Sequence, residues 1–278
     1  MTERGPCRGT RTTAIGAFAA LLALAAYPVH AQGFDRSVDD NCSVILPPDG
    51  GDQVLTTSEP IPAGKTILID LVYNHTLVLQ GATDDAGNTY DIAETDTDQS
   101  FDVTAMVGDI QTPLGAGQHI TLSYLTGVLR GTACALAYRV DGISGGYLGS
   151  DVSNSSFGTG SLARVSIFDT QLSAPGEFMQ LVFYAQPLVG DVTGTINLPL
   201  VEQSSVCTTT INNRMCRLSA YGVLPTADAF TASLSLSGSV SWGAVFVTYL
   251  LAPEPSAGAL ELGALAALTV LARSRRDR

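Results

Sequence analysis

The sequence predicts an all-β protein whose exported body is a two-sheet antiparallel sandwich of immunoglobulin-like or jelly-roll type. Three observations support this fold class. Between its two ends, the 278-residue chain shows no convincing helical period. Short segments rich in β-branched and aromatic residues recur instead, and polar turns separate them. About ten such segments follow one another, which is typical of sandwich folds.

The first segments already indicate buried strands and tight turns. Thr66–Tyr73 is a nearly continuous apolar run, as expected for a strand that is buried on both faces. Segments 76–81 and 89–93 flank Asp-Asp-Ala-Gly-Asn at 84–88, whose residue types predict a turn. Further strands are expected at 101–105, 118–124, 133–140, 162–168, 178–186, 192–198 and 214–224.

The end of the body shows the clearest alternation. From Phe230 to Ser237, apolar residues interleave with threonine and serine, which predicts one apolar face and one hydroxyl face. After Gly238, the segment Val240–Leu251 is apolar on both faces and includes Trp242. We therefore expect two successive strands here, the second of them central.

The N-terminal residues 1–31 have the features of a secretory signal peptide. A basic start precedes an apolar core at 14–26, and Val29-His30-Ala31 supplies small residues at the two positions that a signal peptidase reads. Cleavage after Ala31 leaves Gln32 as the mature N-terminus. The secreted domain then extends over residues 32–252.

The C-terminal residues 253–278 consist of three parts. Pro253-Glu254-Pro255-Ser256 comes first and an apolar run, Ala257–Ala272, follows. The run is long enough for roughly 24 Å of helix, slightly short of a hydrocarbon core of about 30 Å. It predicts a C-terminal transmembrane helix, although Glu261 interrupts its apolar character. Arginines complete the tail and hold its end on the cytoplasmic side: Arg273, Arg275, Arg276 and Arg278.

This three-part tail resembles the PEP-CTERM sorting signal of Gram-negative bacteria. The resemblance implies a transient inner-membrane anchor that an exosortase-type membrane peptidase recognises and processes. It further implies a final place at the cell surface or outside the cell, in association with exopolysaccharide or biofilm matrix. An ordinary C-terminal membrane anchor is the alternative interpretation.

A second resemblance concerns the body. Residues 82–90, Ala-Thr-Asp-Asp-Ala-Gly-Asn-Thr-Tyr, resemble the Asp-x-x-Gly-Asn-x-Tyr hairpin of β-sandwich modules in bacterial surface proteins. Gly115–Leu122 resembles the strand entry that follows this hairpin. The resemblance implies a single domain from about Gln53 to Ala252, closed by the strand at 240–251. Generic hairpin chemistry is the alternative.

The charge of the body restricts its partners. Residues 32–252 hold seven basic and 22 acidic side chains, a net charge of −15. Nucleic acid is therefore excluded as a partner, because its binding relies on Lys and Arg at the phosphates. Calcium is a better candidate, and it binds to oxygen ligands in flexible loops. The acidic stretch is expected to be a solvated loop, and if the protein binds calcium, the candidate ligands are Asp91, Glu94, Asp96, Asp98 and Asp102.

Four cysteines follow the signal peptide, an even number that predicts two disulfides in an exported chain. Three connectivities are possible. We expect Cys207 to pair with Cys216, because only a short segment with Asn212-Asn213 separates them and could turn a hairpin. Cys42 and Cys134 then pair by elimination.

Catalytic motifs are weak. Gly142-Ile-Ser-Gly-Gly146 matches Gly-x-Ser-x-Gly, but no helical period follows it, and His75 and His119 both precede Ser144, against the order of that fold. We therefore expect a non-enzymatic protein without catalytic or cofactor-binding residues.

Two other functions stay open. A carbohydrate-binding or adhesive module requires an exposed aromatic platform, for which the candidates are Tyr124, Tyr147, Phe157, Tyr184 and Tyr221. A hydrolase requires a cleft in which His75 or His119 lies beside a carboxylate and a serine.

Overall fold

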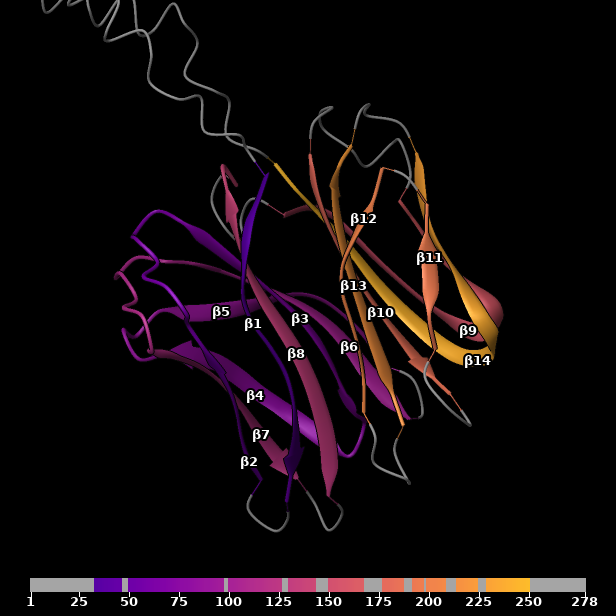
Figure 1. The fold of residues 1–278 in the computed structure, drawn as a ribbon, viewed down its shortest axis with the longest axis horizontal. Helices are drawn as coiled ribbons and strands as arrows, with labels where there is room; N and C mark the ends of the chain where they lie inside the picture. The colour runs from indigo at the N-terminus through magenta and orange to yellow at the C-terminus, as the bar shows by residue number, and fades with distance from the viewer. Residues whose placement is uncertain are drawn as a thin grey trace, which may run out of the picture. The chain divides into compact units, whose positions relative to one another are not determined.

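The body is all-β, as the sequence predicts, and its strands form two antiparallel sheets in the computed structural model (Figure 1). The structure describes residues 33–46, 50–97, 100–126, 130–143, 150–167, 177–187, 192–197, 199–208, 214–224 and 229–250. Within these ranges every named element is a strand, from β1 to β14.

The first sheet has eight strands in the order β1-β8-β3-β6-β5-β4-β7-β2. Their bounds are β1 (Gly33–Ile45), β2 (Gly51–Thr56), β3 (Thr66–Asn74), β4 (Leu77–Asp84), β5 (Thr89–Thr97), β6 (Phe101–Asp109), β7 (His119–Thr126) and β8 (Gly131–Asp141). The sheet curls until its two edge strands, β1 and β2, approach each other (Figure 1). Its concave side encloses one apolar core, to which Ile69, Leu122 and Ala135 belong.

Side chains join the two edges where they meet. Gln53 of β2 is fully buried, and its Nε2 donates to the Asn41 carbonyl at 3.0 Å and to Asn41 Oδ1 at 2.9 Å. In return, Asn41 Nδ2 donates to the Val54 carbonyl at 2.6 Å, and the Thr56 amide donates to Asp39 Oδ2 at 2.7 Å. These bonds satisfy backbone groups that an open sheet edge would leave free.

The second sheet has the order β11-β14-β10-β13-β12, and β9 pairs with β14 outside this path. Its strands are β9 (Ser150–Ile167), β10 (Phe178–Gln186), β11 (Gly194–Ile196), β12 (Val201–Cys207), β13 (Cys216–Val223) and β14 (Phe230–Tyr249). The long strand β14 changes register against β9 between Ser235 and Val240 and curves visibly in Figure 1. Leu234 and Phe246, on either side of this point, therefore contribute to the same core.

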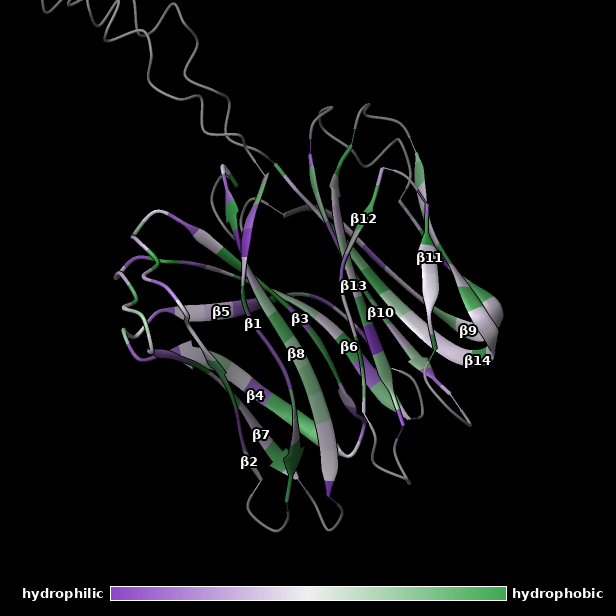
Figure 2. Ribbon diagram, viewed as in Figure 1, coloured by the Kyte–Doolittle hydropathy of each residue, from purple (hydrophilic) through white to green (hydrophobic). Residues whose placement is uncertain are grey.

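A third core lies between the two sheets and explains which strands are most apolar. It contains Leu68, Leu136 and Val103 from the first sheet, and Val182 and Val245 from the second. Strands β3 and β10 border a core on each face, so nearly all of their residues are buried. This confirms the prediction of a fully buried strand at 66–73. Figure 2 shows the same apolar character along β8.

Two disulfides link paired strands, and both follow the predicted connectivity. Cys42 of β1 lies opposite Cys134 of β8 and is bonded to it. Cys207 of β12 lies opposite Cys216 of β13 and is bonded to it. The expected turn at Asn212-Asn213 lies outside the described residues.

The observed strands differ from the predicted ones in five places. Four strand segments are not predicted because they are rich in polar residues: β1, β2, β12 and the first half of β9. The two strands expected at 230–237 and 240–251 form one continuous strand, whose pairing with β9 shifts register between Ser235 and Val240.

Residues Gln32–Ala252 form one compact unit. The predicted signal peptide at 1–31 and the predicted tail at 253–278, including Pro253, Glu254, Pro255, Ser256, Arg273, Arg275, Arg276 and Arg278, lie outside the described residues. In the described ranges, the structure contains no helix with the length and hydropathy of a membrane span.

Candidate functional site

The acidic stretch proposed for calcium lies on strands, which corrects the solvated-loop interpretation. Asp91, Glu94 and Asp96 belong to β5, and Asp102 lies on β6. Asp98 is outside the described residues. Glu94 and Asp96 occupy alternate positions on one face of β5, about 7 Å apart along the strand. Asp102 lies across from Thr97, so its side chain is on the other face of the sheet from those of Glu94 and Asp96.

These carboxylates have separate partners. Ser153 of β9 donates to Glu94 Oε2, and His75 Nδ1 lies 2.9 Å from Asp102 Oδ1. Among the residues that the structure describes, no three His, Cys, Asp or Glu side chains are placed to hold a metal ion. The described part of the stretch therefore offers no converging set of calcium ligands.

The Asp-x-x-Gly-Asn-x-Tyr segment is a hairpin, as predicted, and its side chains stabilise the turn. Asp84 Oδ1 accepts from the amides of Ala86 and Asn88, while Asp84 Oδ2 accepts from Asn88 Nδ2 at 2.8 Å and from the Tyr90 hydroxyl at 2.9 Å. Gly87 adopts a φ of 84°, a left-handed conformation that favours glycine. The aspartate, the asparagine and the tyrosine of the motif thus have a structural role.

The second motif, Gly115–Leu122, meets this hairpin. The His119 amide donates to Asp85 Oδ2 at 2.9 Å, and the Asp85 amide donates to the His119 carbonyl at 3.0 Å. His119 Nδ1 also lies 3.1 Å from Asp85 Oδ2. The two stretches that carry the resemblance to surface modules are therefore neighbours in space.

Both histidines considered for hydrolysis lie beside carboxylates, but on open surface. The His75 side chain is 51% exposed next to Asp102, and the His119 side chain is 47% exposed next to Asp85. Ser144 lies outside the described residues. Neither histidine lines the hollow described below.

The candidate aromatic platform is divided between the interior and the surface. Tyr124 and Tyr184 are buried, so they do not form a platform. Tyr221 is half-buried, with its ring stacked on Phe34 at a centroid distance of 4.5 Å. Phe157 on β9 is 63% exposed, and Tyr147 lies outside the described residues.

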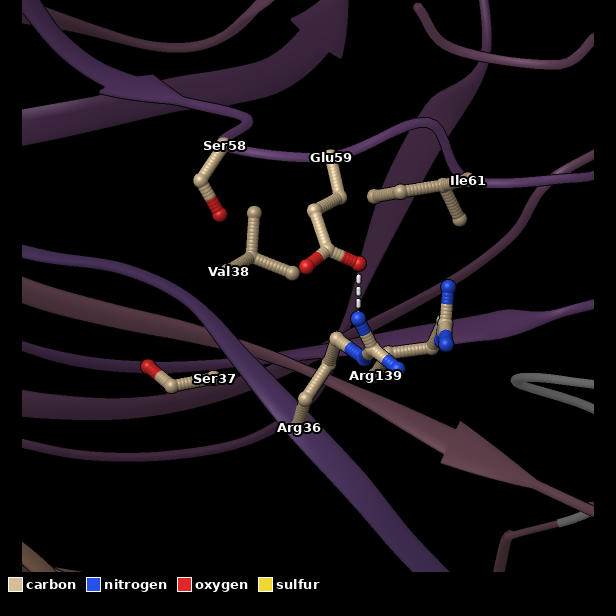
Figure 3. Close-up of a pocket in the computed structure, with 7 residues that line it drawn as sticks. All are labelled: Arg36, Ser37, Val38, Ser58, Glu59, Ile61 and Arg139. Atoms are coloured by element: carbon tan, nitrogen blue, oxygen red, sulfur yellow. Dashed lines mark hydrogen bonds and ion pairs between the residues drawn. The ribbon is translucent and has the colours of Figure 1, made fainter. Parts of the chain in front are cut away.

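A small hollow lies between β1, β8 and the segment after β2 (Figure 3). Its lining residues are Arg36, Ser37, Val38, Ser58, Glu59, Ile61 and Arg139. Arg36 pairs with Glu59 across it, and Arg139 Nε donates to Asp35 Oδ2 at 2.5 Å. With a cavity volume of about 10 Å³, it has room for about one water molecule.

The most unusual side chains lie in the core between the sheets. Asp70 of β3 is fully buried, and its Oδ1 accepts from Gln180 Nε2 of β10 at 2.7 Å. Gln180 Oε1 in turn accepts from the Tyr249 hydroxyl at 2.5 Å, and the Tyr138 hydroxyl lies 3.5 Å from Asp70 Oδ1. Burial raises the pKa of Asp70 to about 6, because the loss of hydration outweighs the hydrogen bonds and the charge of Arg217, which lower this pKa.

Arg217 of β13 faces the same core and is also fully buried. Its Nη2 donates to Asp40 Oδ1 at 2.7 Å and to Ser204 Oγ at 3.2 Å. Burial lowers the pKa of Arg217, and Asp40 opposes this effect. We name Asp70, Gln180, Tyr138, Tyr249, Arg217 and Ser219 the inter-sheet polar cluster.

Sequence reasoning did not identify this cluster. The available signal was a single carboxylate in the middle of the apolar run 66–73, where a charge is costly. Its partners could not be inferred, since Gln180 follows Asp70 by 110 residues.

Comparison with known proteins identifies no relative. No protein-family model matches the chain, and neither a curated protein nor a solved structure matches it.

Proposed function

We propose that the chain is a non-enzymatic exported protein that is sorted and processed at its C-terminus. In this proposal an exosortase-type peptidase acts on the Pro253-Glu254-Pro255 tail at the inner membrane. The body then resides at the cell surface or in extracellular, polysaccharide-containing matrix. As part of the same proposal, we assign the body to the immunoglobulin-like or jelly-roll sandwiches.

The observation that carries the proposal is the combination of the tail sequence with two disulfides. Disulfides persist in oxidising compartments outside the cytoplasm, and here each joins a pair of adjacent strands. The signal-peptide features of residues 1–31 support the same direction of transport.

The uses of the polar side chains also support a structural role. Asp84, Asn88 and Tyr90 hold a turn, and Gln53 holds the seam between β1 and β2. These residues brace the scaffold, as expected for a durable module outside the cell.

The test is fractionation of a host that carries an exosortase, followed by blotting for the body. Wild-type protein should be found as a shortened form outside the inner membrane. Pro253→Ala with Pro255→Ala should accumulate at full length in the membrane, because an extended recognition segment is lost while the apolar run is kept. The matched control is Pro60→Ala with Pro62→Ala, two exposed prolines of the same spacing in the body, which should behave as wild type. Wild-type protein found only at full length in the membrane would overturn the proposal.

Phe157 favours a second candidate, a carbohydrate-binding or adhesive module. Its ring is 63% exposed on β9, and exposed aromatic rings stack on sugars and other apolar surfaces. If this function is correct, Phe157→Ala should reduce retention on an exopolysaccharide column, whereas Leu125→Ala, at an exposed apolar position on β7, should not. Equal retention of both variants and wild type would exclude this role for Phe157.

A further inference from the structure

Asp70 is placed where a carboxylate is least expected. It is in the middle of β3, with Ala105 of β6 and Leu136 of β8 as its cross-strand neighbours. Its side chain points toward the second sheet, into the core that Leu68 and Val72 share with Val182 and Val245. A charge in such surroundings loses its hydration and needs a close ionic partner to compensate.

The hydrogen-bonding groups that reach Asp70 are neutral. Gln180 Nε2 is the near donor at 2.7 Å, and the Tyr138 hydroxyl is at 3.5 Å. Burial raises the pKa of Tyr138 and of Tyr249 well above their ordinary values, so both phenols stay neutral. These contacts suit a neutral carboxyl group as well as a carboxylate.

Among the residues that the structure describes, the buried cation near Asp70 is directed elsewhere. Arg217 forms its ion pair with Asp40 at 2.7 Å rather than with Asp70. Arg217 and Ser219 face the carboxyl from β13 and lower its pKa, although neither comes within hydrogen-bonding distance of Asp70 Oδ2. The attraction therefore offsets only part of the desolvation.

Several buried atoms of the cluster have no hydrogen-bond partner among the described residues. They are Asp70 Oδ2, Arg217 Nε, Arg217 Nη1 and Ser219 Oγ. A protonated Oδ2 is a donor, and Ser219 Oγ is an acceptor on the facing strand. A protonated Oδ2 could therefore donate to Ser219 Oγ, whereas an ionised Oδ2 could only accept from the serine hydroxyl.

We propose that Asp70 is a buried proton-binding site which couples the packing of the two sheets to pH. When the proton is bound, the inter-sheet polar cluster is neutral except for Arg217, which Asp40 pairs from β1. When the proton leaves, a carboxylate remains in the core, which is bordered by β3, β8, β10, β13 and β14. Arg217 is near this carboxylate but forms its ion pair with Asp40. The fold is therefore less stable with Asp70 ionised.

The direction of the pH effect follows from linkage. Asp70 binds its proton more tightly in the folded protein, at a pKa of about 6 against 3.8 for an unperturbed aspartate. Stability from this group is then present at acidic pH and is lost as pH rises through about 6. Because the whole chain contributes to the pH dependence of unfolding, the effect of Asp70 must be measured as a difference between variants.

The test compares wild type with Asp70→Asn by urea unfolding at several values of pH from 4 to 8. Asparagine copies the shape and neutrality of the protonated carboxyl. Relative to this variant, the folding equilibrium constant of wild type should fall on the order of fiftyfold between pH 4 and pH 8. The control Asp91→Asn removes an exposed carboxylate of β5 and should run parallel to wild type. A wild type that gains stability over Asp70→Asn as pH rises would overturn the proposal, because the ionised form would then be the stabilising one.

A second measurement covers the case in which Asp70→Asn does not fold. In wild-type protein with ¹³C-labelled aspartate, the carboxyl carbon of Asp70 should titrate with a midpoint near pH 6. A midpoint at or below that of an unperturbed aspartate, 3.8, would contradict the proposal.

Discussion

The pairing of Gly243 with Tyr184 gives a direct test of how the second sheet is packed. The two residues lie opposite each other on β14 and β10. A Cβ atom added at Gly243 would come 2.9 Å from Tyr184 Cδ1 and closer still to Cε1, and real Cβ atoms essentially never approach within 3.0 Å. The ring has little room to move, since Tyr184 is 1% exposed and contacts Phe101 at a centroid distance of 5.4 Å.

The expected cost of Gly243→Ala follows from two opposing effects. Overpacking a well-filled core costs about 1–3 kcal/mol. Alanine recovers about 0.5–1 kcal/mol, because glycine loses more conformational freedom in a strand. We therefore expect a net loss of about 1–2 kcal/mol in the free energy of unfolding. For a protein of this size, that loss corresponds to a fall in Tm of roughly 2–8 °C.

The assay is thermal unfolding of Gly243→Ala beside Gly238→Ala. Gly238 lies on the same strand, but a Cβ added there would have no heavy atom within 4 Å. Its replacement should leave Tm unchanged or raise it slightly. Adding Tyr184→Leu to Gly243→Ala should cost less than Tyr184→Leu alone, because the smaller side chain removes the clash. Equal Tm values for the two glycine variants would refute the packing described for β10 and β14.

Three further predictions follow from the same structure. Removing the Cys207–Cys216 disulfide by double serine substitution should lower the free energy of unfolding by about 2–3 kcal/mol, because it closes a loop of 9 residues. Removing Cys42–Cys134 should cost about 4–5 kcal/mol, because its loop has 92 residues. Urea unfolding midpoints measure both losses, and the reverse order would contradict the entropic argument. Gln53→Leu should lower stability by about 1–3 kcal/mol in the same assay, because it leaves buried partners at the β1–β2 seam without a donor. Because the described carboxylates of β5 and β6 do not converge, chelation with EDTA should leave Tm unchanged, and a fall of several degrees would show that a bound metal ion stabilises the fold.

Periodicity predicted the parts of the fold that border two cores. Thr66–Tyr73 has apolar residues at nearly every position because β3 has one core on each side. The end of β14 has the same property, whereas its first half alternates because one face is open. In such strands burial is the dominant influence on residue type, so the sequence carries the signal.

Strands with a polar composition carried no such signal. Strand β1 contains Asp39, Asp40 and Asn41 in succession, which favours a turn when considered locally. In the structure Asp39 and Asn41 close the seam to β2, and Asp40 pairs with Arg217. Each of these partners is distant in sequence, so local patterns could not indicate a strand.

The same reasoning applies to the candidate sites. The hairpin at 84–90 was predictable because Asp84, Asn88 and Tyr90 interact within seven residues. The inter-sheet polar cluster was not, because it exists only when β3, β10 and β13 are brought together. Asp70 alone marked its position.

The intact mass of the protein, isolated without reduction from its native host, reports export, C-terminal processing and oxidation in one experiment. A protein that is exported and sorted as proposed should begin at Gln32, end before Arg273, and be four hydrogen masses lighter than its reduced form because of the two disulfides. A mass equal to that of the complete 278-residue chain with reduced cysteines would show that neither end is processed and that no disulfide forms.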